Sequence, residues 1–215
     1  MRDLFAERAD YLNAHLLESE LPDDPFTLFD AWLTDAFAAR DRGELAEPTA
    51  MVLATAAEGR PSARTVLLKE CTPDGFVFFT NYGSRKARDL SADAAVALQF
   101  GWYALHRQVR VEGQASRVPR AESETYFATR PRGSQLGAWA SAQSSEVASA
   151  EALERAYAEV ERRFEGVDVP CPEYWGGYRV VPELVEFWQG QPSRMHDRLV
   201  YRRLGPAWSI SRLAP

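Results

Sequence analysis

The feature that most limits what this chain can fold into is a series of short segments rich in Val, Leu, Phe and Thr, which begins at Thr49. Turn signals such as Glu58-Gly59 separate these segments. At such spacings antiparallel hairpins are the natural connection, because parallel strands would need a crossover helix between each pair. The pattern favours a closed or partly closed barrel over a doubly wound sheet. Strands are predicted at 50–56, 62–69, 76–80, 94–102, 108–118, 177–181, 184–188, 198–203 and 208–213.

Helical patterns flank these strands. Asp24-Pro25 is a helix-start signal, and apolar residues follow it at helical spacing as far as Gly43. The stretch at 119–164 is also helical in pattern, with a break at Arg130-Pro131. A weaker helical pattern covers residues 1–20. A chain of 215 residues, of which 46% are hydrophobic, is therefore predicted to form one domain of mainly β structure with flanking helices, an α+β fold.

Composition argues against several classes of function. The net charge of -6 disfavours nucleic acid as a partner, since neutralising phosphates requires a basic surplus. Cys71, Cys171 and the 3 histidines are too scattered to predict a metal site or a disulfide framework, so a cytoplasmic location is expected. The longest apolar run, near residues 50–57, is far below the roughly 18 residues needed to span a membrane. The acidic start of the chain does not look like a signal peptide.

Three basic side chains alternate near the end of the chain. Arg194, His196 and Arg198 would share one face of an extended segment, just after a Gly/Pro/Ser turn. Such a face is costly to bury, because an unpaired buried charge costs several kcal/mol. Two interpretations remain open at this point. The segment is a solvated edge strand, or it forms a wall for an anionic, planar ligand with Trp188 beside it.

Further cations occur in two other places. Arg64 and Lys69 stand at the ends of a predicted strand, on opposite faces by alternation unless a bulge intervenes. Ser84 is a possible N-cap, which would place Arg85 and Lys86 in the first turn of a helix. Cations there oppose the helix dipole, whereas a bound phosphate would satisfy both the helix N–H groups and the side chains.

Polar side chains around the predicted helices are less specific signals. Tyr126 and Arg130 are spaced i, i+4, and Ser134 follows one turn beyond Pro131. These three resemble an oxyanion pocket, but surface Tyr–Arg pairs are common, and these residues alone favour the surface pair. The run 143–145 is ambiguous and could cap the helix that ends at Phe164. Gln108 suits the polar edge of a heterocycle. The absence of a GxGxxG motif and of a P-loop disfavours a dinucleotide-type fold.

Motifs in order from about residue 21 to the last residue carry a family resemblance. They are Asp24 to Phe29, Pro48 to Val52, Arg64 to Lys69, Phe79 to Lys86, Arg107 to Val109, Tyr126-Phe127, Arg130 to Arg132, Ser134 to Trp139, Gln143 to Ser145, Tyr174 to Gly177, Glu186 to Gly190, Arg194 to Arg198 and Arg212 to Pro215. The chain resembles the pyridoxamine/pyridoxine 5'-phosphate oxidases, flavin enzymes that make pyridoxal 5'-phosphate. A resemblance so continuous is highly specific.

The resemblance implies an antiparallel split β-barrel that forms a homodimer with FMN at the subunit interface. It implies a flexible N-terminal lid at 1–20 and a single FMN-binding domain at 21–215, with helical additions at about 119–164 and C-terminal strands for dimerisation and substrate. By position, the implied FMN contacts are Arg64, Thr65, Val66, Leu67, Leu68, Lys69, Phe79, Thr80, Arg85, Lys86, Gln108, Gln143, Ser144, Trp188 and Arg198. The implied substrate contacts are Arg8, Tyr11, Lys69, Tyr126, Arg130, Ser134, Arg194 and His196, of which Arg194 and His196 are the expected catalytic residues.

The implied reaction oxidises pyridoxamine or pyridoxine 5'-phosphate with O2, giving pyridoxal 5'-phosphate and H2O2 by hydride transfer from C4' to flavin N5. No metal, nucleic acid or membrane is expected to take part. One alternative within the same fold is a flavin oxidase acting on another small aromatic, as in the phenazine pathway. Another alternative, of a different class, is a non-enzymatic carrier of flavin or pyridoxal phosphate.

Overall fold

A computed structural model describes residues 15–215 of the chain. Arg8 and Tyr11, the two residues expected in an N-terminal lid, lie outside the described residues. The helices are α1 (Pro25–Asp41), α2 (Arg85–Ala92), α3 (Arg120–Thr129), α4 (Arg132–Ala140) and α5 (Ala150–Arg163). The strands are β1 (Ala50–Ala57), β2 (Arg60–Leu67), β3 (Glu70–Thr72), β4 (Gly75–Asn81), β5 (Ala95–Trp102), β6 (Arg107–Arg117), β7 (Trp175–Gln189), β8 (Asp197–Leu204) and β9 (Ala207–Arg212).

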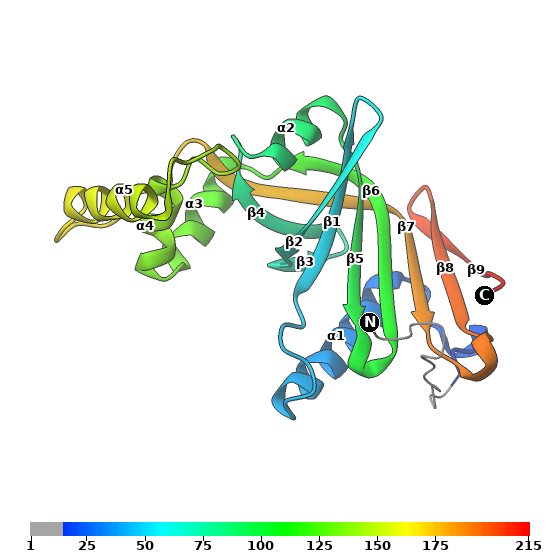
Figure 1. Ribbon diagram of the computed structural model, residues 1–215. Helices are drawn as coiled ribbons and strands as arrows, with labels where there is room; N and C mark the ends of the chain where they lie inside the picture. The colour runs from blue at the N-terminus through cyan, green and yellow to red at the C-terminus, as the bar shows by residue number, and fades with distance from the viewer. Residues whose placement is uncertain (1–14) are drawn as a thin grey trace, which may run out of the picture. The chain divides into compact units, whose positions relative to one another are not determined.

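The strands form one sheet whose hydrogen-bonding order is β2-β1-β5-β6-β7-β4-β3, with β8 paired to β7 and β9 to β8 (Figure 1). The pairings of β3 with β4, β4 with β7, β7 with β8 and β8 with β9 are all antiparallel. This arrangement confirms the predicted mainly β, antiparallel fold with flanking helices. The type of the β1–β2 turn follows from its backbone, because Glu58 and Gly59 both adopt positive φ, as two-residue hairpin turns of type I′ require.

Two compact units can be distinguished within the chain. The first contains the described residues up to Leu53 together with Ala97–Gly113 and Pro182–Pro215, and the second contains Ala54–Val96 and Gln114–Val181. Strand β7 supplies residues to both of them.

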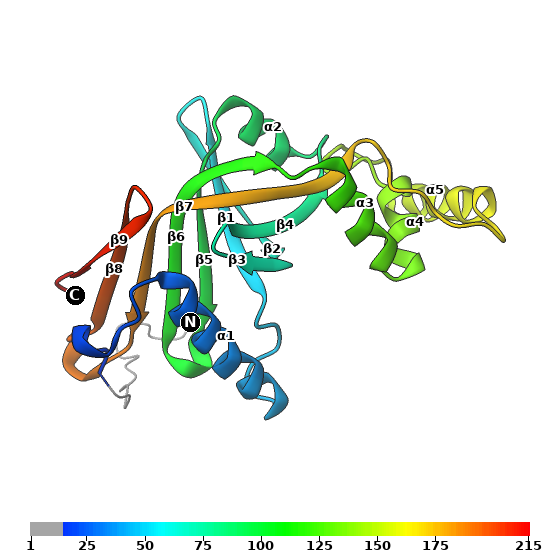
Figure 2. The ribbon, with the colours of Figure 1, turned by 180° about the vertical axis from the view of Figure 1, so that it is seen from behind.

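Helix α1 covers one side of the strands in the first unit (Figure 2). Its N-cap is Asp24, whose side chain accepts hydrogen bonds from the N–H groups of Phe26 and Thr27, so the helix starts where the sequence predicts. Phe29 packs edge-on against Phe100, with ring centroids 4.9 Å apart, and is almost fully buried. Burial of an aromatic side chain of this size provides much of the driving force that holds a helix on a sheet.

Helices α3, α4 and α5 gather in the second unit (Figure 1). They share a small hydrophobic core formed by Phe127, Leu136, Phe164, Val169 and Trp175. The predicted break at Arg130-Pro131 is present, because α3 ends at Thr129 and α4 begins at Arg132. This break matters for the site, since it turns the chain between two helices and leaves Arg130 at the corner.

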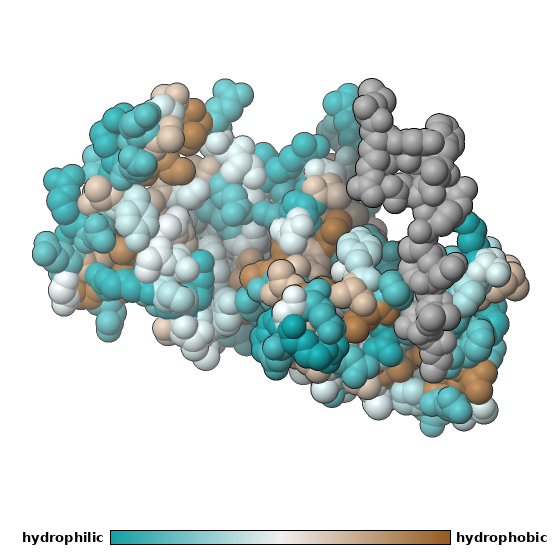
Figure 3. Space-filling view, turned by 60° about the horizontal axis from the view of Figure 1, so that its bottom comes forward, coloured by the Kyte–Doolittle hydropathy of each residue, from teal (hydrophilic) through white to brown (hydrophobic). Residues whose placement is uncertain are grey.

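Large exposed hydrophobic side chains are spread over several elements. On the face in Figure 3, hydrophobic residues lie in small groups among hydrophilic ones. The most exposed large hydrophobic side chains among residues 15–215 include Tyr103, Met195, Leu204, Val147 and Val167. Within this part of the chain, no helix combines the length and the apolar character needed to cross a membrane.

Candidate anion and ligand sites

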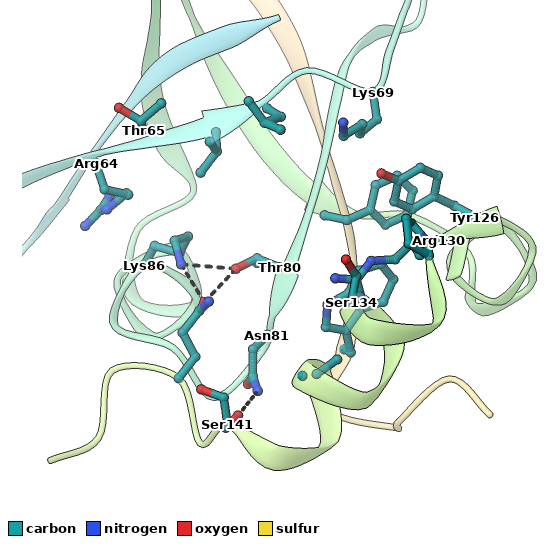
Figure 4. Close-up of a pocket in the computed structure, with 18 of the residues that line it drawn as sticks. Arg64, Thr65, Lys69, Thr80, Asn81, Lys86, Tyr126, Arg130, Ser134 and Ser141 are labelled. Atoms are coloured by element: carbon teal, nitrogen blue, oxygen red, sulfur yellow. Dashed lines mark hydrogen bonds between the residues drawn. The ribbon is translucent and has the colours of Figure 1, made fainter. Parts of the chain in front are cut away.

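A cavity of about 860 Å³ in the second unit collects many of the residues that the sequence singled out (Figure 4). Most of its wall comes from β2, β4, the α3–α4 corner and the loop after α4. Figure 4 shows two groups of basic and hydroxyl side chains on opposite sides of it, here called the Lys86 end and the Arg130 end. The lining residues predicted from sequence are Arg64, Thr65, Val66, Leu67, Lys69, Phe79, Thr80, Lys86, Tyr126, Arg130, Ser134 and Gln143.

The Lys86 end is formed by Arg64, Thr80, Lys86 and Gln143. Lys86 lies in the first turn of α2, as predicted, and is only 9% exposed. Its ammonium group donates to Thr80 Oγ1 at 3.1 Å, Ser84 Oγ at 3.3 Å and Gln143 Oε1 at 2.8 Å, all uncharged oxygens. Burial lowers the pKa of Lys86 to about 8, and the nearby Arg64 contributes to the same shift. A buried cation held by neutral acceptors at a helix N-terminus has the properties of an anion site.

Arg64 is held at this end by neighbours of its own. Its Nη1 donates to Thr55 Oγ1 at 2.7 Å, and its Nη2 lies 3.4 Å from the buried Asp89 Oδ2. Burial lowers the pKa of Arg64, and the charge of Asp89 opposes that shift. The carboxylate of Asp89 is shared with Thr55, at 2.7 Å, so the guanidinium is oriented by a short network rather than by a single ion pair.

The Arg130 end is formed by Lys69, Tyr126, Arg130 and Ser134. Arg130 Nη1 is buried and has no hydrogen-bond partner in the part of the chain that the structure describes. Its guanidinium lies 4.6 Å from the ring centroid of Trp175, and burial lowers the pKa of Arg130. A buried donor that lacks a partner costs about 1–3 kcal/mol, and more when it is charged, so an anion at this position would be stabilising.

Aromatic stacking orients the Tyr126 side chain. Its ring stacks on Phe79 with centroids 4.1 Å apart and planes inclined by 21°. Trp175 continues the stack, 5.4 Å from Phe79. Tyr126 on α3, Arg130 at its C-cap and Ser134 on α4 therefore line one corner of the cavity, as in the pocket interpretation and not as in a surface Tyr–Arg pair.

Several predictions about the surroundings of the cavity are wrong. Arg64 and Lys69 line the same cavity, although alternation placed them on opposite faces, because β2 ends at Leu67 and Lys69 lies beyond the strand. The run 143–145 does not cap α5, since the N-cap of that helix is Ser149. Three of the implied FMN contacts do not line the cavity, since Leu68 is buried and Arg85 and Ser144 are exposed elsewhere; their contact with FMN stays a prediction.

The remaining predicted residues lie in the first unit: Gln108 is on β6, and Trp188, Arg194, His196 and Arg198 lie at or beside the turn that joins β7 to β8. Arg194, His196 and Arg198 do not share one extended face, because Ser193 and Arg194 adopt left-handed backbone angles with φ of 56° and 62°. The extended strand begins only at Asp197. The turn therefore extends through Pro192–Arg194, which form a short 3-10 helix, and the alternation prediction failed because Arg194 lies in the turn and not in the strand.

His196 has a defined hydrogen-bonding state. Its Nδ1 accepts the N–H of Gln191 at 3.1 Å, and its ring packs against Trp188 with centroids 4.6 Å apart. Burial lowers the pKa of His196, and the charge of Arg194 adds to this shift. A neutral ring that accepts at Nδ1 carries its proton on Nε2.

Neighbouring carboxylate and amide groups orient Arg198 and Gln108. Arg198 Nε donates to the buried Glu186 at 2.7 Å. The Gln108 amide oxygen accepts from Gln99 Nε2 at 2.6 Å. Neither Glu186 nor Gln99 was predicted as a site residue, because a lone acidic or amide residue within a strand pattern carries no site signal.

Other residues that sequence reasoning missed are Asn81, Thr129, Pro131, Gly137, Ala138, Ser141 and Trp175, which also line the cavity. For Asn81 and Trp175 a signal was available, since both fall inside motifs quoted for the family resemblance. Among residues 15–215 there is no group of three or more His, Cys, Asp or Glu side chains that could hold a metal ion.

Comparison with known proteins links these features to a family. A family model described as pyridoxamine 5'-phosphate oxidase matches residues 37–164, and a second, described as the pyridoxine 5'-phosphate oxidase C-terminal dimerisation region, matches residues 175–215. Proteins named pyridoxine/pyridoxamine 5'-phosphate oxidase from Rubrobacter xylanophilus and Thermosynechococcus vestitus are 58% and 54% identical to the chain. These alignments cover 100% and 97% of this chain and 97% of each relative.

Two solved structures are also similar. PhzG from Burkholderia lata 383, in complex with tetrahydrophenazine-1-carboxylic acid, superposes with a TM-score of 0.86 at 33% identity, over 94% of this chain and 98% of that chain. An FMN-binding protein from Nostoc punctiforme, related to pyridoxamine 5'-phosphate oxidase, has a TM-score of 0.71 at 17% identity, over 91% of this chain and all of the other, and shows the shared fold.

Proposed function

Because this chain belongs to the pyridoxamine 5'-phosphate oxidase family of oxidoreductases, we propose that it oxidises pyridoxamine 5'-phosphate or pyridoxine 5'-phosphate to pyridoxal 5'-phosphate. The alcohol loses a hydride from C4' and a proton from its oxygen to give the aldehyde directly. The amine loses a hydride from C4' and a proton from its nitrogen to give an imine, and water then converts this imine into the aldehyde and ammonia. FMN, when bound, supplies the electron acceptor at N5, and O2 takes up the two electrons and two protons as H2O2.

The observation that carries the proposal is a pair of cations, buried Lys86 and half-buried Arg130, on opposite sides of one cavity. Lys86 is held by neutral oxygens, and Arg130 has a buried Nη1 without a partner among residues 15–215. Burial desolvates both side chains, and each fits a phosphate. A phosphate would supply the opposite charge that Lys86 lacks among its neutral acceptors, and it would give Arg130 Nη1 a hydrogen-bond acceptor. Two phosphate esters, a cofactor and a substrate, account for two such sites.

The Lys86 end would hold the FMN phosphate. Arg64, Thr80 and Lys86 converge there, and Thr65, Val66, Leu67, Lys69, Phe79 and Gln143 also line the cavity. Arg85 and Ser144 are next to this end in sequence, and both are exposed. We propose that Gln108, Trp188 and Arg198 contact the flavin in a homodimer with FMN at the subunit interface. The match of residues 175–215 to a dimerisation region supports a homodimer.

The Arg130 end would hold the substrate phosphate through Lys69, Tyr126, Arg130 and Ser134. The binding energy of this phosphate, which is remote from the reacting C4', would then help to set the distance between C4' and flavin N5. Arg194 and His196 would meet the pyridine ring, with Arg8 and Tyr11 closing over it from the N-terminal segment. Because Nδ1 of His196 already accepts a hydrogen bond, its Nε2–H can donate to the ring oxygen of the substrate, and we assign His196 this orienting role.

The pKa of Lys86 gives a pH prediction for FMN binding. Since burial lowers that pKa to about 8 in the protein without ligand, the ammonium form dominates below pH 8 and is lost above it. If only the ammonium form binds phosphate, the affinity for FMN should fall as the pH rises, approaching about tenfold per pH unit above pH 8. Fluorescence titration of the apoprotein with FMN between pH 7 and 9 measures this slope.

The matched variant for this titration is Lys86→Arg, because a guanidinium stays charged throughout that pH range. The affinity of Lys86→Arg should be nearly independent of pH, whatever its absolute value. A wild-type affinity that does not change from pH 7 to 9 would show that Lys86 does not bind the FMN phosphate as a titrating cation.

The likeness to PhzG makes a reduced phenazine carboxylate the alternative substrate class. The FMN-loaded protein should be incubated in air with pyridoxamine 5'-phosphate, with pyridoxine 5'-phosphate or with a tetrahydrophenazine carboxylate, while aldehyde and peroxide are followed. We expect turnover with both vitamin B6 phosphates and much slower oxidation of the phenazine above its spontaneous rate. Preferential phenazine oxidation would favour the alternative, and no turnover with any substrate would favour a carrier.

A further inference from the structure

The carboxylate of Asp197 is the meeting point of three separate segments in the first unit. Asp197 is the first residue of β8, pairs with Gln189 across the hairpin and is only 4% exposed. Its Oδ2 lies 3.1 Å from His15 Nδ1 and accepts the N–H of Leu16 at 3.2 Å. Its Oδ1 accepts from Arg212 Nη1 at 2.6 Å.

A fourth contact joins Asp197 to the turn that carries His196. Gln191 Nε2 donates to Asp197 Oδ2 at 2.9 Å, and Gln191 is 2% exposed. The backbone N–H of the same residue donates to His196 Nδ1. Gln191 therefore bridges two groups: its side chain donates to the carboxylate of Asp197, and its backbone N–H donates to the imidazole of His196.

The four donors keep this carboxylate ionised. Burial alone would raise the pKa of Asp197, but the hydrogen bonds from Arg212, Leu16, Gln191 and His15 together hold it below its usual value. Arg212 is itself held in place, because Glu18 accepts from its Nε at 2.8 Å and from its Nη2 at 2.9 Å. The N-terminal segment and β9 are thus tied to the β7–β8 turn through one charge.

We infer that Asp197 is a positioning residue of the active site, which fixes Gln191 and through it the tautomer and orientation of the His196 ring. The inference rests on the proposed role of His196. In this arrangement, Asp197 does not contact the substrate. It binds the side chain of Gln191, whose backbone N–H donates to the imidazole of His196. Because its other partners are Leu16 and Arg212, it also makes the geometry of His196 depend on how the N-terminal segment is anchored.

The chain offers a matched control for the bridging glutamine. Gln189 is also 2% exposed, lies on the same hairpin and is fully engaged, accepting from Arg107 Nε and donating to the carbonyl oxygens of Leu105 and His106. The side-chain hydrogen bonds of Gln189 thus go to Arg107, Leu105 and His106, not to Asp197 or His196. Replacing either glutamine with leucine removes buried hydrogen bonds, so both variants should lose stability, but only Gln191→Leu removes the bridge to Asp197.

The first test observes the imidazole without relying on activity. With 3 histidines in the chain, ¹⁵N NMR of the ring nitrogens can be assigned using a His196→Gln variant. In the wild type we expect a neutral His196 with its proton on Nε2 and a depressed pKa. In Gln191→Leu the tautomer preference of His196 should weaken, and the pKa of His196 should rise toward the ordinary value of about 6.5. The reason is that the hydrogen bond from the Gln191 N–H to His196 Nδ1 weakens while the charge of Asp197 is unchanged. In Gln189→Leu the His196 signals should stay as in the wild type.

The second test measures rates with pyridoxamine 5'-phosphate. In Asp197→Asn one carboxylate oxygen becomes an N–H2 group, which cannot accept from Gln191 if the oxygen stays on Arg212. We expect kcat to fall at least tenfold in Asp197→Asn and Gln191→Leu, with little change in FMN content, and to change less than twofold in Gln189→Leu.

Unchanged His196 signals in Gln191→Leu, or equal rate losses in the Gln189 and Gln191 variants, would overturn the positioning role. A wild-type protein without turnover would instead refute the proposed function, and the NMR comparison would still decide whether Asp197 positions His196.

Discussion

Replacing Arg130 with methionine should raise KM for pyridoxamine 5'-phosphate by roughly 30- to 3,000-fold and leave FMN content unchanged. Removing one partner of a buried, hydrogen-bonded charge pair costs about 2–5 kcal/mol, and about 1.4 kcal/mol corresponds to tenfold. Arg130 is suited to such an effect because its Nη1 is buried without a partner in the described chain and its guanidinium is fixed over Trp175. Methionine keeps much of the apolar stem, so packing is disturbed little.

The matched control for this variant is Arg132→Met. Arg132 lies two residues further along, but its guanidinium donates to the carbonyl oxygens of Val167 and Phe164 and does not line the cavity. Its loss should reduce stability without changing KM. Steady-state kinetics with pyridoxamine, which lacks the phosphate, completes the comparison, because Arg130→Met should abolish most of the preference for the phosphorylated substrate. If both arginine variants change KM equally, Arg130 is not a phosphate ligand.

Replacing Arg194 with alanine should lower kcat by about 100-fold, while the variant still purifies with FMN. Misplacing a substrate relative to the group with which it reacts costs about this much. Arg194 lies in the β7–β8 turn with a φ of 62° and is exposed in the described chain, so its side chain is available to a ligand and its loss removes no buried contact. Stopped-flow measurement of flavin reduction separates this step from product release.

Arg202→Ala is the control for Arg194→Ala. Arg202 lies on β8, is exposed and carries the same charge, so its removal changes the overall electrostatics of the protein in the same way. We expect a normal kcat for this control. If Arg194→Ala instead lost FMN and retained normal residual activity, Arg194 would be a flavin ligand and not a substrate ligand.

Local sequence rules predicted the parts of this fold that local physics determines. Asp24-Pro25 marks the start of α1 because the aspartate side chain caps the first turn and proline lacks only an N–H that would remain unpaired. The alternation of apolar residues identified most strands to within two residues. The break at Arg130-Pro131 followed from the restriction that proline places on the residue before it.

Where the sequence prediction failed, tertiary pairing decided the outcome. Two strands were predicted at 177–181 and 184–188, but β7 runs continuously through both. Its residues up to Val180 pair with β4, and those from Leu184 pair with β8, so Pro182 lies between the two ladders, where its missing N–H breaks neither. Strand β3 was missed because three residues are too few to show a period.

The candidate site shows the same division. Spacing placed Tyr126, Arg130 and Ser134 at one helical corner, but it could not distinguish a pocket from a surface Tyr–Arg pair. Charge alone could not predict that Lys86 is buried among neutral acceptors while the adjacent Arg85 is exposed, since that difference depends on which side of α2 packs inward. The proposed role of Asp197 depends on contacts with His15, Leu16, Gln191 and Arg212, which come from three segments of the chain. No sequence pattern around Asp197 predicts these contacts.

The most direct test of the central claim is to mix the FMN-loaded protein with pyridoxamine 5'-phosphate in the absence of O2 and to record the visible absorbance of the flavin. We expect the absorbance to bleach in a single turnover, with one pyridoxal 5'-phosphate formed per FMN, and to return when O2 is admitted. A flavin that remains oxidised in the presence of saturating pyridoxamine 5'-phosphate and pyridoxine 5'-phosphate would contradict the claim that this cavity brings a vitamin B6 phosphate to FMN.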